Sequence, residues 1–181
     1  MTTSERGKTI CFIDNANIFH GQKVAGWRID WERFAEYFQQ GDDPLWQTYF
    51  FASEHDPPGA EESAFFDFLK EKMRWEVLTY RLGKRTEKCV ACGNERTVPA
   101  EKGVDVGLAT KMLSLAVNRA YDTAILVSGD RDYVETVRVV KGLGLRVEVV
   151  SWRGGLSNDL ETESSAPVVL LDALERDLRK Q

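Results

Sequence analysis

The sequence predicts a single α/β domain built on a mainly parallel sheet. Short apolar runs that contain β-branched residues recur along the chain without a polar break, as expected of strands buried on both faces. Between these runs lie segments whose apolar residues recur at helical spacing. A length of 181 residues, of which 43% are hydrophobic, suffices for one globular core. Alternating strands and helices imply right-handed crossovers, which bring the carboxyl ends of the parallel strands to one edge of the sheet.

The first half of the chain follows this alternation. Residues 8–14 form an apolar run that ends in Asp14, and we expect a loop or short helix directly after it. Asp30 is a suitable N-cap for a packing helix that extends to residue 38. The elements that follow are predicted to be an aromatic strand at 45–52, a helix at 61–74 and a strand at 75–82.

A polar segment at 83–101 interrupts the alternation, and we expect it to be an inserted hairpin or loop. It is rich in basic residues and carries Cys89 and Cys92 in a Cys-x-x-Cys spacing. This spacing resembles half of a zinc knuckle, but tetrahedral zinc takes four ligands and the chain has no second cysteine pair. A Zn²⁺ site, a redox pair and two unliganded loop cysteines therefore all stay open.

The second half returns to helices and strands. A helix is predicted at 103–118, with Asp105 in its first turn. Glycines at 142 and 144 are suited to end the helix that precedes a strand at 145–152. The remaining elements are expected to be a strand at 123–127, a capped helical turn at 157–161, a short strand at 168–171 and a terminal helix at 173–180.

Two aspartates, Asp130 and Asp132, lie where the predicted strand at 123–127 gives way to a helix. In an open α/β sheet this is the edge at which ligands bind. Helix capping alone would explain one carboxylate, and for an isolated Gly-Asp-x-Asp it is as good an explanation as a ligand site. Asp14 ends its own strand at the same edge. Strand direction alone does not place Asp105 there.

The composition narrows the classes of function. A formal net charge of −5 argues against a protein that coats polyanions in general, so any nucleic-acid site must be local. No apolar run approaches the ~18 residues of a membrane span, and no signal-peptide core is present. We therefore expect a cytoplasmic protein with no membrane partner, whose three cysteines are reduced thiols or metal ligands.

Three short blocks, in this order, resemble the signature blocks of the NYN domain family. They are Phe12-Ile-Asp-Asn-Ala-Asn-Ile18, Lys102-Gly-Val-Asp-Val106 and Leu126-Val-Ser-Gly-Asp-Arg-Asp-Tyr133. More closely, they resemble its LabA-like (DUF88) branch within the PIN-like nuclease superfamily. The resemblance implies a three-layer α/β/α sandwich with Rossmann-like topology. It also implies acidic residues that bind Mg²⁺ or Mn²⁺ for RNA hydrolysis.

Carried onto this sequence, the resemblance gives a metal-ligating and catalytic set of Asp14, Asp105, Asp130 and Asp132. Asn17 and Ser128 are implied polar supports on the substrate side, and Lys102 is either a phosphate contact or an ordinary exposed lysine. Mg²⁺ and Mn²⁺ prefer oxygen ligands and keep several waters. Such ions can activate water and stabilise charge on a phosphate. The implied function is a metal-dependent ribonuclease whose nucleophile is water.

Two features bear on rival functions. Many relatives carry an Ala-Asp pair after the last helix, whereas this chain has Pro167 at about that point, so one acidic contributor is absent. Phosphatases of the haloacid-dehalogenase type need a second aspartate two residues after the nucleophile, and Ala16 occupies that position. A binding or regulatory module that retains the acidic site and turns over slowly or not at all stays open, because intact ligands do not guarantee activity.

The expected partner is single-stranded RNA, and a homodimer is also compatible with the sequence. Basic residues of the insertion, together with Trp27 and Arg28, could contact phosphates and stack on bases. Solvated loop charge is the alternative explanation for the same residues.

Overall fold

The computed structural model describes residues 6–39, 45–88, 92–100 and 103–181. At its centre is a six-stranded sheet in the order β3-β2-β1-β6-β7-β8, in which every pair of neighbouring strands is parallel. The sheet therefore confirms the predicted parallel architecture. Its strands are β1 (Thr9–Asp14), β2 (Leu45–Glu54), β3 (Glu76–Arg81), β6 (Thr123–Val127), β7 (Arg146–Ser151) and β8 (Val169–Leu170).

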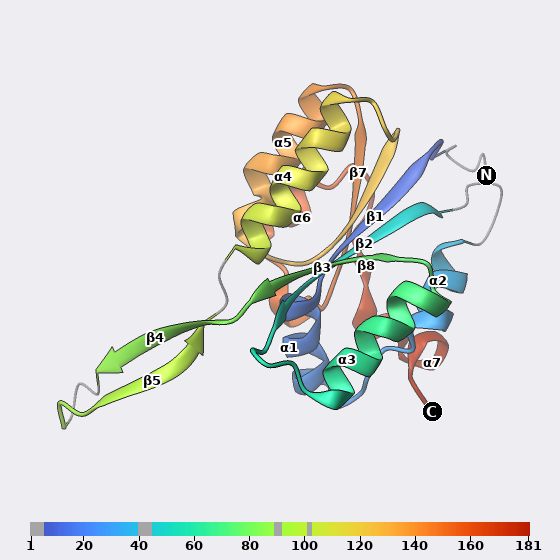
Figure 1. Ribbon diagram of the computed structural model, residues 1–181. Coiled ribbons are helices and arrows are strands. Elements are labelled where there is room, and N and C mark those ends of the chain that lie inside the picture. Colours follow the sequence, from blue (N-terminus) through green and yellow to red (C-terminus); the bar gives the residue numbers. More distant parts are fainter. Residues whose placement is uncertain (1–5, 40–44, 89–91, 101–102) are drawn as a thin grey trace.

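Helices cover both faces of this sheet and complete the three-layer sandwich (Figure 1). One layer holds α1 (Asn15–Ala25), α2 (Trp31–Phe38), α3 (Ala60–Asp67) and α7 (Glu175–Leu178). The other holds α4 (Val104–Val117), α5 (Val134–Gly142) and α6 (Asn158–Glu163). A π-helical turn at Phe68–Lys72 extends α3, and 3-10 turns lie at Arg131–Tyr133, Arg153–Gly155 and Leu171–Leu174.

Each face of the sheet has its own hydrophobic core, because successive side chains of a strand point to opposite faces. On β1, Ile13 packs in the core beneath α1 and α2, whereas Phe12 packs in the core beneath α4 and α5. Asp30 caps α2 as predicted, since its carboxylate accepts hydrogen bonds from two backbone N–H groups of the first turn. No helix in the described ranges is both long and apolar enough to cross a membrane.

The order of the strands creates a topological switch point between β1 and β6. The chain passes from β1 outward through β2 to β3, and then returns to build β6, β7 and β8 on the other side of β1. The crossover connections therefore diverge on either side of the β1–β6 pair. In open α/β sheets the crevice at such a point, outside the carboxyl ends of the strands, is where ligands bind.

The insertion at 83–101 contains an antiparallel hairpin of β4 (Gly83–Lys88) and β5 (Glu95–Ala100), which projects away from the sandwich (Figure 1). Cys92 is exposed and has a free thiol. Cys89 and Lys102 lie outside the described residues, so the Zn²⁺ site and the phosphate contact stay predictions.

The hairpin lengthens the connection from β3 to α4 without moving the start of α4 away from the carboxyl edge. Because β4 leaves from the carboxyl end of β3 and β5 returns to the same region, α4 starts at the carboxyl edge and runs antiparallel to the sheet (Figure 1). Asp105, in the first turn of α4, is thereby brought to the edge where Asp14 lies.

Candidate active site

Asp14 is the central residue of the candidate site. It is the last residue of β1 and the N-cap of α1, where its Oδ1 accepts a hydrogen bond from the Asn17 N–H at 3.3 Å. Its side chain is only 2% exposed, and its Oδ2 accepts hydrogen bonds from Ser128 Oγ at 3.1 Å and Tyr133 OH at 3.3 Å. The pKa of Asp14 is raised to about 6, because burial and, to a lesser extent, the negative charge of Asp105 outweigh the three hydrogen bonds, which lower it.

Tyr133 joins Asp14 to Asp105. Its hydroxyl lies 3.3 Å from Asp14 Oδ2 and 3.3 Å from Asp105 Oδ1. A phenol has one proton to donate, so it can satisfy only one of the two carboxylates at a time. Burial, followed by the charges of the two carboxylates, raises the pKa of the Tyr133 hydroxyl, which therefore remains a neutral donor.

Asp130 and Asp132 contribute negative charge to the same edge. Burial raises the pKa of Asp105, and the nearby charges of Asp130 and Asp132 raise it further. Asp130 also has a local structural role, because its Oδ1 accepts the Asp132 N–H at 3.0 Å and caps the 3-10 turn at Arg131–Tyr133. Asp130 can therefore cap this turn and still belong to the acidic cluster.

Ser128 and Asn17 tie the two strand ends together. Ser128 is fully buried, accepts the Asp130 N–H at 3.2 Å and donates to Asp14, so it orients the Asp14 carboxylate and holds the backbone at Asp130. Asn17 Oδ1 accepts the Gly129 N–H at 3.1 Å, which connects α1 to the turn after β6. A Cβ on Gly129 would lie 2.2 Å from the Gly155 carbonyl oxygen, so only glycine fits where these backbones meet. Direct substrate contact by either polar side chain remains a prediction.

Residues 8–171 match the NYN domain. The chain belongs to the NYN domain family. This confirms the family that the three sequence blocks predicted, which comprises nuclease-related, PIN-like domains.

Two proteins are similar to this NYN domain over most of its length. The low amplitude and bright protein LabA of Synechococcus elongatus is 24% identical over 162 residues, which cover 89% of this chain and 82% of LabA. A crystal structure of VPA0982, a protein of unknown function from Vibrio parahaemolyticus, superposes with a TM-score of 0.71 at 19% identity and covers 99% of this chain and 100% of that chain. The first similarity supports a LabA-like assignment, and the second supports the fold.

The side chains of this NYN domain fit a hard divalent cation in chemistry, but they are not gathered into a finished metal site. The donors are carboxylates, the ligands that Mg²⁺ and Mn²⁺ prefer. Among the described residues, one carboxylate oxygen of Asp105, one of Asp130 and both of Asp132 have no hydrogen-bond partner. Within those residues, however, no three His, Cys, Asp or Glu side chains converge closely enough to hold a metal. The part of the site that the structure shows in contact is Asp14 and Asp105, which both lie within hydrogen-bonding distance of the Tyr133 hydroxyl.

The sequence does not single out one residue of the site, and one candidate RNA contact is buried. Tyr133 follows two aspartates and has apolar neighbours at helical spacing, and the available signal is that a buried tyrosine hydroxyl needs a partner. Trp27, one of the residues that could contact RNA, is buried, and its ring packs edge-on against Trp152, with ring centroids 4.9 Å apart. Arg28 is exposed, in agreement with the expectation of a surface cation.

Proposed function

We propose that this NYN domain is a metal-dependent ribonuclease, which hydrolyses RNA phosphodiester bonds with a water nucleophile and uses Mg²⁺ or Mn²⁺. The observation that supports this function is the buried Asp14 carboxylate, which shares the Tyr133 hydroxyl with Asp105. Asp130 and Asp132 add further negative charge. Among the described residues none of the four carboxylates has an ion pair, and the neighbouring Arg131 is paired instead with Asp159 at 2.9 Å. A divalent cation would neutralise this excess of charge.

Asp14 and Asp105, with Asp130 and Asp132 beside them, would hold the ion. When bound, the ion would lower the pKa of water and stabilise charge on the phosphate. The chain itself supplies positioning: Ser128 and the Asn17 backbone hold Asp14 in one orientation, and α4 presents Asp105 to the same Tyr133 hydroxyl. No side-chain nucleophile is required, and neither histidine has a place among these contacts.

The test is cleavage of labelled single-stranded RNA by the purified protein in Mn²⁺, with and without EDTA. An Asp130→Asn variant removes one charge from the cluster, and Asp67→Asn on the exposed surface of α3 makes the same chemical change away from it. We expect cleavage that requires metal, persists in Asp67→Asn and is lost in Asp130→Asn. Equal cleavage by wild type and Asp130→Asn would contradict the proposal.

A second candidate function is an RNA-binding module with little or no turnover. It is favoured by the lack of three converging ligands in the described residues and by the Tyr133 hydroxyl between Asp14 and Asp105. In the same assay, this module would bind Mn²⁺ and RNA without cleaving any of several RNA sequences.

A further inference from the structure

A groove between α1 and α3 begins beside the acidic edge. Its volume is about 820 Å³, and its lining starts at Asn15 and Ala16, the two residues that follow Asp14. Ser53, near the carboxyl end of β2, also lines it. The groove therefore lies next to the candidate active site, on the face of the sheet that carries α1 and α3 (Figure 1). We call it the α1–α3 groove.

Exposed aromatic surface lines the α1–α3 groove. Phe19 on α1 is 44% exposed, and Phe65 on α3 is half-buried. The ammonium of Lys23 lies 4.3 Å from the centroid of the Phe19 ring. One face of an aromatic ring can carry a cation while the other stacks on a planar group, and nucleobases stack on aromatic rings without regard to sequence.

Polar groups in the groove fit the edges of bases. Ser53 Oγ is buried and has no hydrogen-bond partner among the described residues, a state that a hydrogen-bonding ligand would relieve. Glu62 is already engaged, since it accepts from His55 Nδ1 at 3.0 Å and from the backbone N–H groups of His55 and Gly59. Glu61 is exposed in the groove, and a carboxylate there can accept a hydrogen bond from the amino group of a base.

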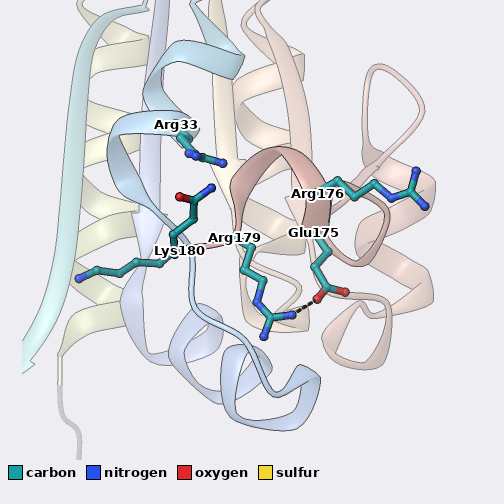
Figure 2. A pocket seen from close by; sticks show the side chains of 6 residues that line it. Arg33, Glu175, Arg176, Arg179 and Lys180 are labelled. Atoms are coloured by element: carbon teal, nitrogen blue, oxygen red, sulfur yellow. Dashed lines mark hydrogen bonds and ion pairs between the residues drawn. The ribbon is translucent and has the colours of Figure 1, made fainter.

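Arg28 and Lys180 are the cations in the lining of the groove. Both are exposed, and within the described ranges neither has an ion pair. Lys180 also lines a neighbouring cavity of about 460 Å³ (Figure 2). In that cavity Arg179 is paired with Glu175 at 2.6 Å, whereas Arg176 extends away from the other cations. Arg28 and Lys180 are therefore available to the phosphates of a strand in the groove.

We propose that the α1–α3 groove is the binding channel for single-stranded RNA. The bases lie against Phe19 and Phe65, the phosphates lie near Arg28 and Lys180, and the RNA continues past Asn15 to the carboxylate edge. Aromatic rings, an unsatisfied hydroxyl and free cations in one groove match the combination of stacking, base-edge hydrogen bonding and charge neutralisation that single strands require. RNA is chosen over other single strands because the proposal rests on the proposed ribonuclease function.

The test is fluorescence anisotropy of a labelled short oligouridine with the full chain in EDTA, where metal-dependent cleavage does not occur. Phe19→Ala is expected to weaken binding about tenfold, and Phe19→Trp is expected to retain it. Val24→Ala is the matched control, because Val24 is 75% exposed on the same helix and does not line the groove. The Arg28→Ala/Lys180→Ala double variant is expected to weaken binding and to reduce its salt dependence.

The channel would be overturned if Phe19→Ala and Val24→Ala bound oligouridine with equal affinity, or if an abasic oligomer bound as tightly as oligouridine. It would also be overturned if wild type showed no saturable binding of oligouridine, or bound an aromatic peptide in place of RNA. The two proposals can fail separately. Metal-dependent cleavage with an unchanged affinity of Phe19→Ala would retain the nuclease and reject the channel. Oligouridine binding that depends on Phe19, without cleavage in Mn²⁺, would retain the channel and reject the nuclease.

Discussion

Replacing Asp14 with asparagine is expected to stabilise the metal-free protein at neutral pH. Burial raises the pKa of Asp14 from its ordinary 3.8 to about 6, so ionisation of this carboxyl opposes folding. Asparagine has the same shape and no charge, it can still accept the Asn17 N–H, and its amide can donate to the Ser128 and Tyr133 hydroxyls. Asn is also as good an N-cap for α1 as Asp. The variant therefore removes the charge, at the cost that the Ser128 hydroxyl hydrogen loses its acceptor.

The size of the effect follows from the difference in pKa. A change of about 2 in pKa corresponds to about 3 kcal/mol, which is the most that the substitution can gain. Because the folded-state pKa is the higher one, the carboxyl does not reduce stability below about pH 4, and the penalty grows as pH rises through about 6. The gain of Asp14→Asn should therefore be at most about 1.5 kcal/mol at pH 5 and at most about 3 kcal/mol at pH 8, and it should increase by about 1.5 kcal/mol between the two.

Urea unfolding in EDTA at pH 5 and pH 8, followed by circular dichroism, measures this difference. In a separate thermal unfolding experiment at pH 8, the melting temperature of Asp14→Asn should exceed that of wild type by roughly 5–10 °C. Addition of Mn²⁺ should raise the stability of wild type and have much less effect on the variant. A variant less stable than wild type at pH 8, or a difference that does not change between pH 5 and pH 8, would refute this reasoning.

Three further predictions concern the same edge. Mn²⁺ affinity, measured by isothermal titration calorimetry, should weaken up to tenfold per pH unit below about pH 6, because Asp14 then binds a proton; equal affinities at pH 5.5 and 7.5 would contradict this. Tyr133→Phe should lower the free energy of unfolding in EDTA by about 1–3 kcal/mol, because the two carboxylates lose their shared donor. An unchanged urea unfolding curve would count against that role. Gly129→Ala should lower the free energy of unfolding by more than about 2 kcal/mol, because its Cβ would meet the Gly155 backbone. Gly142 has open space around it, so Gly142→Ala should be neutral or slightly stabilising in the same urea unfolding measurement.

The sequence predicted those parts of the site that depend on strand ends. β1 is a short apolar run that ends in Asp14, and β6 is one that is followed directly by the Ser128–Asp132 turn. Burial and strand direction therefore sufficed to bring these residues to one edge. The position of Asp105 did not follow from this reasoning, because the insertion obscured the connection from β3 to α4. A crossover helix begins at the carboxyl end of the preceding strand, and the hairpin only lengthens that connection.

Side-chain partners were harder to predict than positions. Trp27 and Tyr133 are both aromatic residues near loops, and only packing distinguishes a ring buried against Trp152 from a hydroxyl that reaches two carboxylates. The α1–α3 groove was not predictable at all. Its walls come from Phe19 and Phe65, on helices whose separation depends on how both pack against the sheet.

The most direct test of the central claim is the single-turnover cleavage rate of labelled single-stranded RNA as a function of Mn²⁺ concentration, for wild type and Asp105→Asn. The fold places Asp105 at the edge, beside the Tyr133 hydroxyl and the charges of Asp130 and Asp132. We predict a rate that saturates with Mn²⁺ in wild type and falls more than about a hundredfold in Asp105→Asn. Equal rates in the two proteins, or cleavage that persists in EDTA, would contradict the assignment of this acidic edge as a metal-dependent ribonuclease site.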